Sequence, residues 1–131
     1  MDIVITGVGS ICDSLFQEYA KANRVDIRHL QAAGVVGDIA YCPVSRVGEL
    51  QGLRMENGDQ CEFYRAVSLD VLKEMSRDPS KRVIVVAQNP PMGNSNKTDV
   101  IHAALVGRLC NVLITDDYTA DDLRKRFVGL T

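Results

Sequence analysis

Three short segments of the sequence carry side chains that can bind a hydroxylated, anionic small molecule. Asp38 lies in a glycine-flanked run, residues 34–39, and its carboxylate can accept two sugar hydroxyl hydrogen bonds or act as a general base. Lys97 opens an apolar helix, where its ammonium group and the unpaired N–H groups of the helix end can meet one phosphate. Asp116 ends the apolar run 112–116, on the side where open α/β sheets bind ligands. These residues predict a ligand-binding domain and no catalytic set.

A glycine pair near the N-terminus is a fourth candidate. Gly7 and Gly9 follow the β-branched run 3–6, a pattern typical of a buried strand that leads into a glycine loop. The backbone N–H groups of such a loop can bind an oxygen-rich ligand. The pair lacks the third glycine of a dinucleotide-binding fingerprint, and a tight strand-to-helix turn is the ordinary alternative.

The other candidates also have ordinary structural interpretations. Asp38 can cap a turn through local backbone N–H groups, and most lysines are simply exposed. Asp116 can cap the next helix, a role that we expect for at least one member of the pair Asp116 and Asp117. The charge of Lys97 is unfavourable at a helix N-terminus, because the helix dipole is positive there, so a bound anion is the expected compensation.

Composition and charge exclude several classes of function. The 131 residues are 46% hydrophobic with a formal net charge of −2, an ordinary balance for one globular domain. Nucleic-acid binders concentrate positive charge, whereas the dense basic stretch 124–126 shares its helix with Asp121 and Asp122. We therefore expect no nucleic-acid binding by this chain. No apolar run is long enough to span a bilayer, so we expect no membrane partner.

The cysteines predict neither a metal site nor a cofactor. The four residues are widely spaced, contain no Cys-x-x-Cys pair, and are accompanied by two histidines: Cys12, Cys42, Cys61 and Cys110. An even count would permit two disulfides, but the N-terminus lacks the pattern of a secretory signal. We therefore expect reduced thiols in a cytoplasmic protein.

Alternating strand and helix patterns predict an α/β fold, with a mostly parallel sheet flanked by helices. The predicted strands cover residues 3–6, 35–43, 60–67, 82–87 and 111–115. The predicted helices cover 12–23, 24–33, 69–75, 97–108 and 118–127. Ser68 is the expected N-cap of the third helix, Gly34 the expected C-cap of the second, and Asn57-Gly58 the expected turn of a hairpin. The continuous apolar run 82–87 is typical of a strand buried on both faces.

The order of these motifs resembles the sugar-binding effector domain of SorC-type, DeoR-related transcriptional regulators. That family shows a glycine-containing strand end, then Gly-Ala-Val-Gly-Asp-Ile, Gly-Gly-x-x-Lys, an Ala-Ala-Leu helix and a Leu-Ile-Thr-Asp-Glu strand end. The counterparts here are residues 7–9, residues 34–39, Lys97, residues 103–105 and residues 113–117. Two features depart from the pattern. Gln88 and Asn89 replace the Gly-Gly pair, and the family's helix-turn-helix and phosphate loop precede the matching region.

The resemblance implies a fold, a ligand and an assembly. The fold would be like that of glucosamine-6-phosphate deaminase and ribose-5-phosphate isomerase, with residues 1–131 forming one effector domain that is partial relative to the family. The ligand would be a sugar or a sugar phosphate, bound by Gly7, Gly9, Asp38, Lys97 and Asp116. We also expect a homo-oligomer, because a sheet without its upstream strands leaves an edge to be paired or covered.

Two other functions stay open. One is a sugar-phosphate isomerase or deaminase, with Asp38 as the proton-transfer base and Lys97 holding the substrate phosphate. The other is a vestigial domain that only mediates association. Binding of a sugar phosphate without turnover would indicate the effector domain, and turnover would indicate the enzyme. Absence of binding would indicate the association domain.

Overall fold

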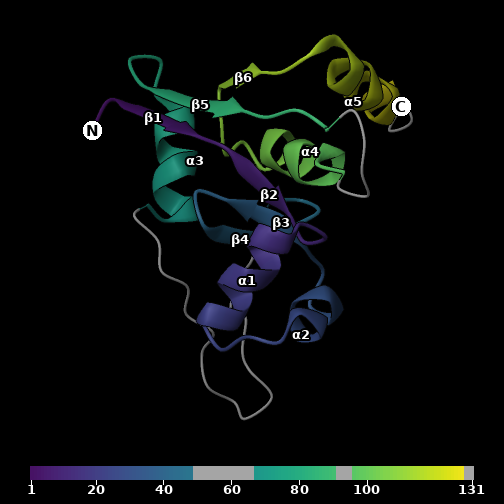
Figure 1. Cartoon of the computed structure of the whole chain (residues 1–131). Helices are drawn as coiled ribbons and strands as arrows, with labels where there is room; N and C mark the ends of the chain where they lie inside the picture. Colours follow the sequence, from purple (N-terminus) through teal and green to yellow (C-terminus); the bar gives the residue numbers. More distant parts are fainter. Residues whose placement is uncertain (49–66, 91–95, 129–131) are drawn as a thin grey trace.

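The computed structural model describes residues 1–48, 67–90 and 96–128 of the chain. The elements are stacked in layers: a parallel sheet, a pair of helices, an antiparallel sheet and a second pair of helices (Figure 1). The first pair is α3 (Leu69–Arg77) with α4 (Thr98–Val106), and the second is α1 (Ser14–Ala22) with α2 (Ile27–Ala32). A fifth helix, α5 (Asp117–Val128), packs beside α4. The predicted combination of a parallel sheet with flanking helices is confirmed.

The parallel sheet is built from strands that are far apart in the sequence. Its order is β1-β5-β6, where β1 is Ile3–Thr6, β5 is Arg82–Val86 and β6 is Val112–Ile114. Buried and exposed residues alternate along β5, since Val83 and Val85 are fully buried while Val86 is exposed. The prediction that this strand is buried on both faces is wrong, because none of the described helices covers the outer face of the sheet.

The second sheet was not predicted from the sequence. It is antiparallel, with the order β2-β3-β4, where β2 is Val8–Ser10, β3 is Val35–Ile39 and β4 is Cys42–Ser45. The prediction of a single strand over 35–43 is wrong, because the chain reverses at Ala40 and Tyr41. Both residues have positive φ angles, +49° and +63°, the backbone that a two-residue hairpin needs. The region 7–9 is likewise mostly strand, with Val8 and Gly9 in β2.

The helices agree with the predicted ones to within a few residues. The Ser68 hydroxyl accepts a hydrogen bond from the Val71 N–H, which confirms the predicted cap of α3. Helix α2 begins later than expected, because the Asp26 carboxylate caps it by accepting from the Arg28 N–H at 2.8 Å. Gly34 follows α2 with a φ of +85°, as expected for a glycine just past a helix end.

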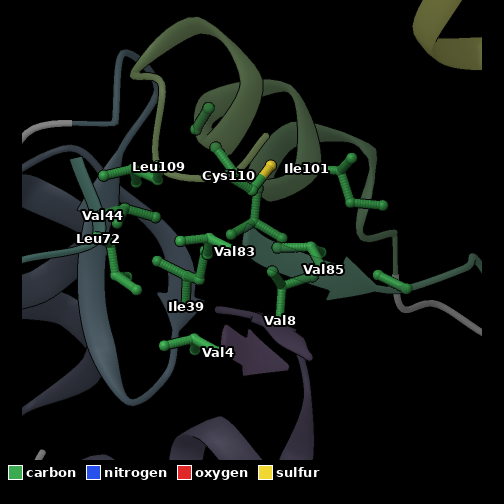
Figure 2. Packing of buried hydrophobic residues seen from close by; sticks show 14 of the residues in the cluster. Val4, Val8, Ile39, Val44, Leu72, Val83, Val85, Ile101, Leu109 and Cys110 are labelled. Carbon is green, nitrogen blue, oxygen red and sulfur yellow. The ribbon is translucent and has the colours of Figure 1, made fainter. Parts of the chain in front are cut away.

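A hydrophobic core joins the two sheets through α3 and α4. Val83 and Val85 of the parallel sheet meet Ile39 and Val44 of the antiparallel sheet in one cluster, together with Leu72 of α3 (Figure 2). A smaller cluster lies between the other face of the antiparallel sheet and helices α1 and α2, around Phe16 and Leu30. The antiparallel sheet is therefore covered on both faces, in contrast to the parallel sheet.

Some predicted features lie outside the described residues. These are the turn at Asn57-Gly58, residues 60–66 of one predicted strand, and Cys61. Among the residues that are described, Cys12, Cys42 and Cys110 form no disulfide. The same described residues include neither a helix long and apolar enough to cross a membrane nor a His, Cys, Asp and Glu cluster that could hold a metal ion.

Candidate functional site

A pocket of about 330 Å³ opens where β1 ends and the antiparallel sheet begins. Its lining includes Gly7, Gly9, Asp38 and Lys97, so the fold brings together four of the five residues singled out from the sequence. The volume is at the lower end of the range for small-molecule sites, roughly 300–1,000 Å³. A second hollow, of about 390 Å³ beside Arg46 and Asp99, contains none of the five.

Asp38 lies on β3, next to the turn that joins it to β4. Its Oδ2 accepts a hydrogen bond from the Tyr41 N–H at 3.2 Å, so the local capping role considered for this residue is present. Burial raises the pKa of Asp38 to about 6, while backbone hydrogen bonds from Tyr41 and Gly9 and the charge of Lys97 pull the pKa down. The carboxyl group is therefore largely desolvated and still lines the pocket, which suits it to accept hydrogen bonds from a ligand.

Gly9 makes room for this carboxylate. Gly9 and Asp38 are partners in the register of β2 and β3, and a Cβ on Gly9 would overlap Asp38 Oδ1. The glycine is therefore needed for the shape of the pocket, whether or not its own backbone contacts a ligand. Gly7 follows β1 directly and contributes backbone to the pocket wall.

Lys97 is the N-cap residue of α4 and is held there by Asn89. The Asn89 Oδ1 accepts from the Lys97 N–H at 2.6 Å, and its Nδ2 donates to the buried Thr98 hydroxyl at 2.7 Å. The Asn89 N–H donates to the buried hydroxyl of Thr119 on α5 at 3.0 Å. Asn89 thus joins the loop after β5 to two helices. In the sequence, Asn89 was noted only because it stands where the family pattern has a glycine. That difference did not reveal that Asn89 connects the loop to the two helices.

Asp116 is placed differently from the other four residues. It precedes α5, and its Oδ1 accepts from the Thr119 N–H at 2.8 Å. Hydrogen bonds from Thr119 hold the pKa of Asp116 below its usual value. Asp116 therefore has the capping geometry that we considered for this pair of aspartates, and it is not among the described residues that line the pocket.

The pocket combines two carboxyl groups with one ammonium group. Asp13, the N-cap residue of α1, lines the pocket with Asp38, and its charge helps to raise the pKa of Asp38. Lys97 is the only cation among the described lining residues. Carboxylates accept hydrogen bonds and an ammonium group donates them, so the site suits a ligand rich in hydroxyl groups with at most one anionic group.

The aromatic members of the lining were missed in the sequence. Tyr19, Phe16 and Tyr41 all line the pocket, and the Tyr19 and Tyr41 rings lie with their centroids 5.1 Å apart. The apolar periodicity of residues 12–23 assigned Phe16 and Tyr19 to a helix face without showing what they would meet. No local pattern indicates that a turn residue such as Tyr41 will pack against Tyr19, a helix residue 22 positions away.

The family of the chain follows from comparison with known proteins. Residues 1–124 match the family described as "Putative sugar-binding domain". The chain belongs to this family. It is a sugar-binding domain homologous to the effector domains of SorC/DeoR-type transcriptional regulators, and it covers only part of them. No curated protein sequence matches it.

Similar solved structures include three regulators. The full-length sorbitol operon regulator SorC from Klebsiella pneumoniae has a TM-score of 0.67 and 22% identity, over 94% of this chain and 34% of that chain. A transcriptional regulator from Streptococcus pneumoniae has a TM-score of 0.69 and 21% identity, over 98% and 44%. A DeoR family regulator from Listeria monocytogenes has a TM-score of 0.63 and 26% identity, over 94% and 44%. The chain thus spans less than half the length of these regulators.

Proposed function

We propose that the pocket binds a sugar, in particular a sugar phosphate, as the effector of a transcriptional regulator. The observation that carries this proposal is the convergence of Gly7, Gly9, Asp38 and Lys97 on one pocket of suitable volume. Asp38 accepts hydrogen bonds from sugar hydroxyls, and the ammonium group of Lys97 binds the phosphate. Asp116 shapes the start of α5 and contacts no ligand directly.

Sugar binding in the pocket would change how copies of the domain associate. The similar structures belong to transcriptional regulators, and the 15 lysines and arginines of this chain are outnumbered by 17 acids. We therefore propose that the domain senses the sugar in the cytoplasm, changes its association, and leaves DNA binding to another region. A sequence-specific complex of this chain with duplex DNA at physiological salt would contradict this division.

Thermal unfolding with a panel of sugars and sugar phosphates tests the ligand. A ligand that binds only the folded state stabilises it, by roughly 2.7 kcal/mol at one hundred times its dissociation constant. We expect at least one member of the panel to raise the unfolding midpoint. If no compound does so at millimolar concentration, the effector function is wrong.

One observation favours a second function, that of a sugar-phosphate isomerase or deaminase. A general base works best when its pKa is near the working pH, and the pKa of Asp38 is raised to about 6. We rank this function below binding, because the similar structures are transcriptional regulators. Exchange of sugar C–H protons with deuterium, followed by NMR, would reveal turnover.

We also propose that the chain self-associates through the outer face of the parallel sheet. Four exposed aliphatic side chains lie on this face, with exposed fractions of 59% for Ile3, 69% for Ile5, 48% for Val86 and 53% for Ile114. Parallel sheets are normally covered on both faces. Among the described residues β1 is also an edge strand, paired only with β5. A second copy of the chain offers the same apolar face and can cover both surfaces about a two-fold axis.

A further inference from the structure

Tyr41 has an unusual position on the rim of the pocket. It lies at the turn between β3 and β4, and its side chain is largely exposed. Its φ of +63° falls in the left-handed region, which bulky residues seldom adopt unless the surrounding structure holds them there. A glycine or an asparagine would fit this backbone without strain. A tyrosine at this position therefore needs contacts that hold its backbone in this conformation. The choice of a tyrosine over a glycine or an asparagine also needs a functional explanation.

The support comes from two directions. The Asp38 carboxylate accepts from the Tyr41 N–H at 3.2 Å, which fixes the turn from the side of β3. The Tyr19 hydroxyl donates to the Tyr41 carbonyl at 3.1 Å, which fixes it from α1. The two rings also pack against each other at an interplanar angle of 47°. The Tyr41 ring is thus held beside the same carboxylate that lines the pocket.

A cyclic sugar has two kinds of surface. Its hydroxyl groups point mainly outward from the edge of the ring, whereas the C–H groups of its faces form a small apolar surface. An exposed aromatic ring beside a hydrogen-bond acceptor complements both surfaces, because covering the aromatic face removes apolar area from water while the hydroxyls remain paired. The pocket offers this combination in Tyr41 and Asp38.

We propose that Tyr41 is the platform on which the C–H face of a cyclic sugar lies, with Tyr19 holding the platform in place. The inference rests on the sugar-binding function proposed above and narrows it to ring-form sugars. An open-chain alditol has no comparable flat C–H face, so it should bind more weakly than the cyclic sugar of the same carbon number. Tyr41 is a specificity-determining residue in this arrangement, and Tyr19 is a positioning residue.

Calorimetric binding to matched pairs of ligands tests the inference. The probes are glucose, mannose and ribose with their alditols, added to the complete chain and to three variants. Tyr41→Asn removes the ring but tolerates the positive φ, and Tyr41→Phe keeps the ring. Tyr118→Asn is the control, because Tyr118 is 82% exposed on α5 and lies outside the described lining. We expect binding about tenfold weaker in Tyr41→Asn and little changed in the other two variants.

A spectroscopic measurement separates a platform from a purely structural role. The chain has no tryptophan and four tyrosines, and its three phenylalanines absorb only weakly, so tyrosine dominates its near-ultraviolet difference spectrum. Sugar binding to the wild-type chain should perturb this spectrum. Tyr41→Phe should lose most of the perturbation while it still binds the sugar.

The outcomes distinguish this inference from the function on which it rests. If the wild-type chain binds neither these sugars nor any sugar phosphate of the panel used in thermal unfolding, both are wrong. If the wild-type chain binds sugar and Tyr41→Asn binds it equally well, the inference about Tyr41 is wrong and the sugar-binding function stands. The same holds if alditols bind as tightly as the cyclic sugars. Circular dichroism checks that each variant is folded. Should Tyr41→Asn fail to fold, Tyr41→Gly suits the same backbone and takes its place.

Discussion

Asp38 combines a stabilising and a destabilising role in one side chain. Its carboxylate supports the hairpin by accepting from the Tyr41 N–H, but burial makes its charged form unfavourable, as its pKa of about 6 indicates. A shift from 3.8 to about 6 corresponds to roughly 3 kcal/mol between the protonated and ionised forms. A fold does not need an ionised group in such a place, so its presence is best explained by a ligand that donates hydrogen bonds to it.

Asp38→Asn should therefore stabilise the chain at neutral pH and weaken sugar binding. The native pKa is above the unfolded one, so the native state binds more protons between about pH 4 and 6, and wild-type stability falls as pH rises through that range. The amide does not ionise. We expect Asp38→Asn to be more stable by roughly 1–2 kcal/mol above pH 6, with the difference vanishing near pH 4. Urea unfolding at pH 4 and pH 7.5 measures this, and a less stable variant at pH 7.5 would contradict it.

The same variant carries a prediction about ligands that contrasts with one for Lys97. Lys97→Ala should weaken the binding of a phosphorylated sugar by roughly 10- to 100-fold, because this is the usual contribution of a hydrogen bond to a charged group. The binding of the free sugar should change little. Asp38→Asn should weaken the binding of both ligands similarly, because both carry the sugar hydroxyls that Asp38 is proposed to contact. Lys21→Ala, in the last turn of α1 and outside the described lining, is the control. Equal losses for both ligands in Lys97→Ala would show that Lys97 acts through structure.

At the scale of elements, the sequence predicted what depends on local patterns. Helix α3 is predicted by the Ser68 cap, and β5 by its apolar run. The β3–β4 hairpin was missed because Ala40 and Tyr41 are not turn residues by type. Their conformation depends on Asp38 and on Tyr19, which lies 22 positions away from Tyr41. Four of the predicted site residues line one pocket, and the aromatic rim of this pocket depends on the hairpin that was not predicted.

Two glycines in this region should differ in how they tolerate a methyl group. A Cβ on Gly37 would overlap the Gly9 carbonyl oxygen of the neighbouring strand and crowd Val100 Cγ2 at 3.1 Å. Gly34 has nothing within 4 Å of such a Cβ, and only its φ of +85° is unfavourable to alanine. We expect Gly37→Ala to lose roughly 2–3 kcal/mol of stability and most sugar binding, and Gly34→Ala about 1 kcal/mol. Urea unfolding compares them, and equal losses would contradict the close approach of β2 and β3.

At the scale of the whole molecule, the two sheets differ in how they are covered. Among the described residues, the antiparallel sheet has a hydrophobic cluster on each face, whereas the parallel sheet has one on the face toward α3 and α4 and none on the other. The regulators of similar structure are more than twice as long as the region that this chain matches. For the 131 residues alone, a second copy of the chain can cover the apolar outer face of the parallel sheet.

Ile5→Lys tests this association, because Ile5 is the most exposed aliphatic side chain of the outer face and belongs to the edge strand β1. Covering each of the four exposed side chains stabilises a dimer by about 1 kcal/mol, whereas a buried lysine without a partner opposes it. In sedimentation equilibrium at micromolar concentrations, the wild-type chain should show twice its mass of 14.4 kDa and Ile5→Lys the monomer mass. Val47→Lys, which replaces an exposed aliphatic residue outside the parallel sheet, should remain dimeric. A monomeric wild-type chain would exclude self-association and leave the outer face for a different polypeptide.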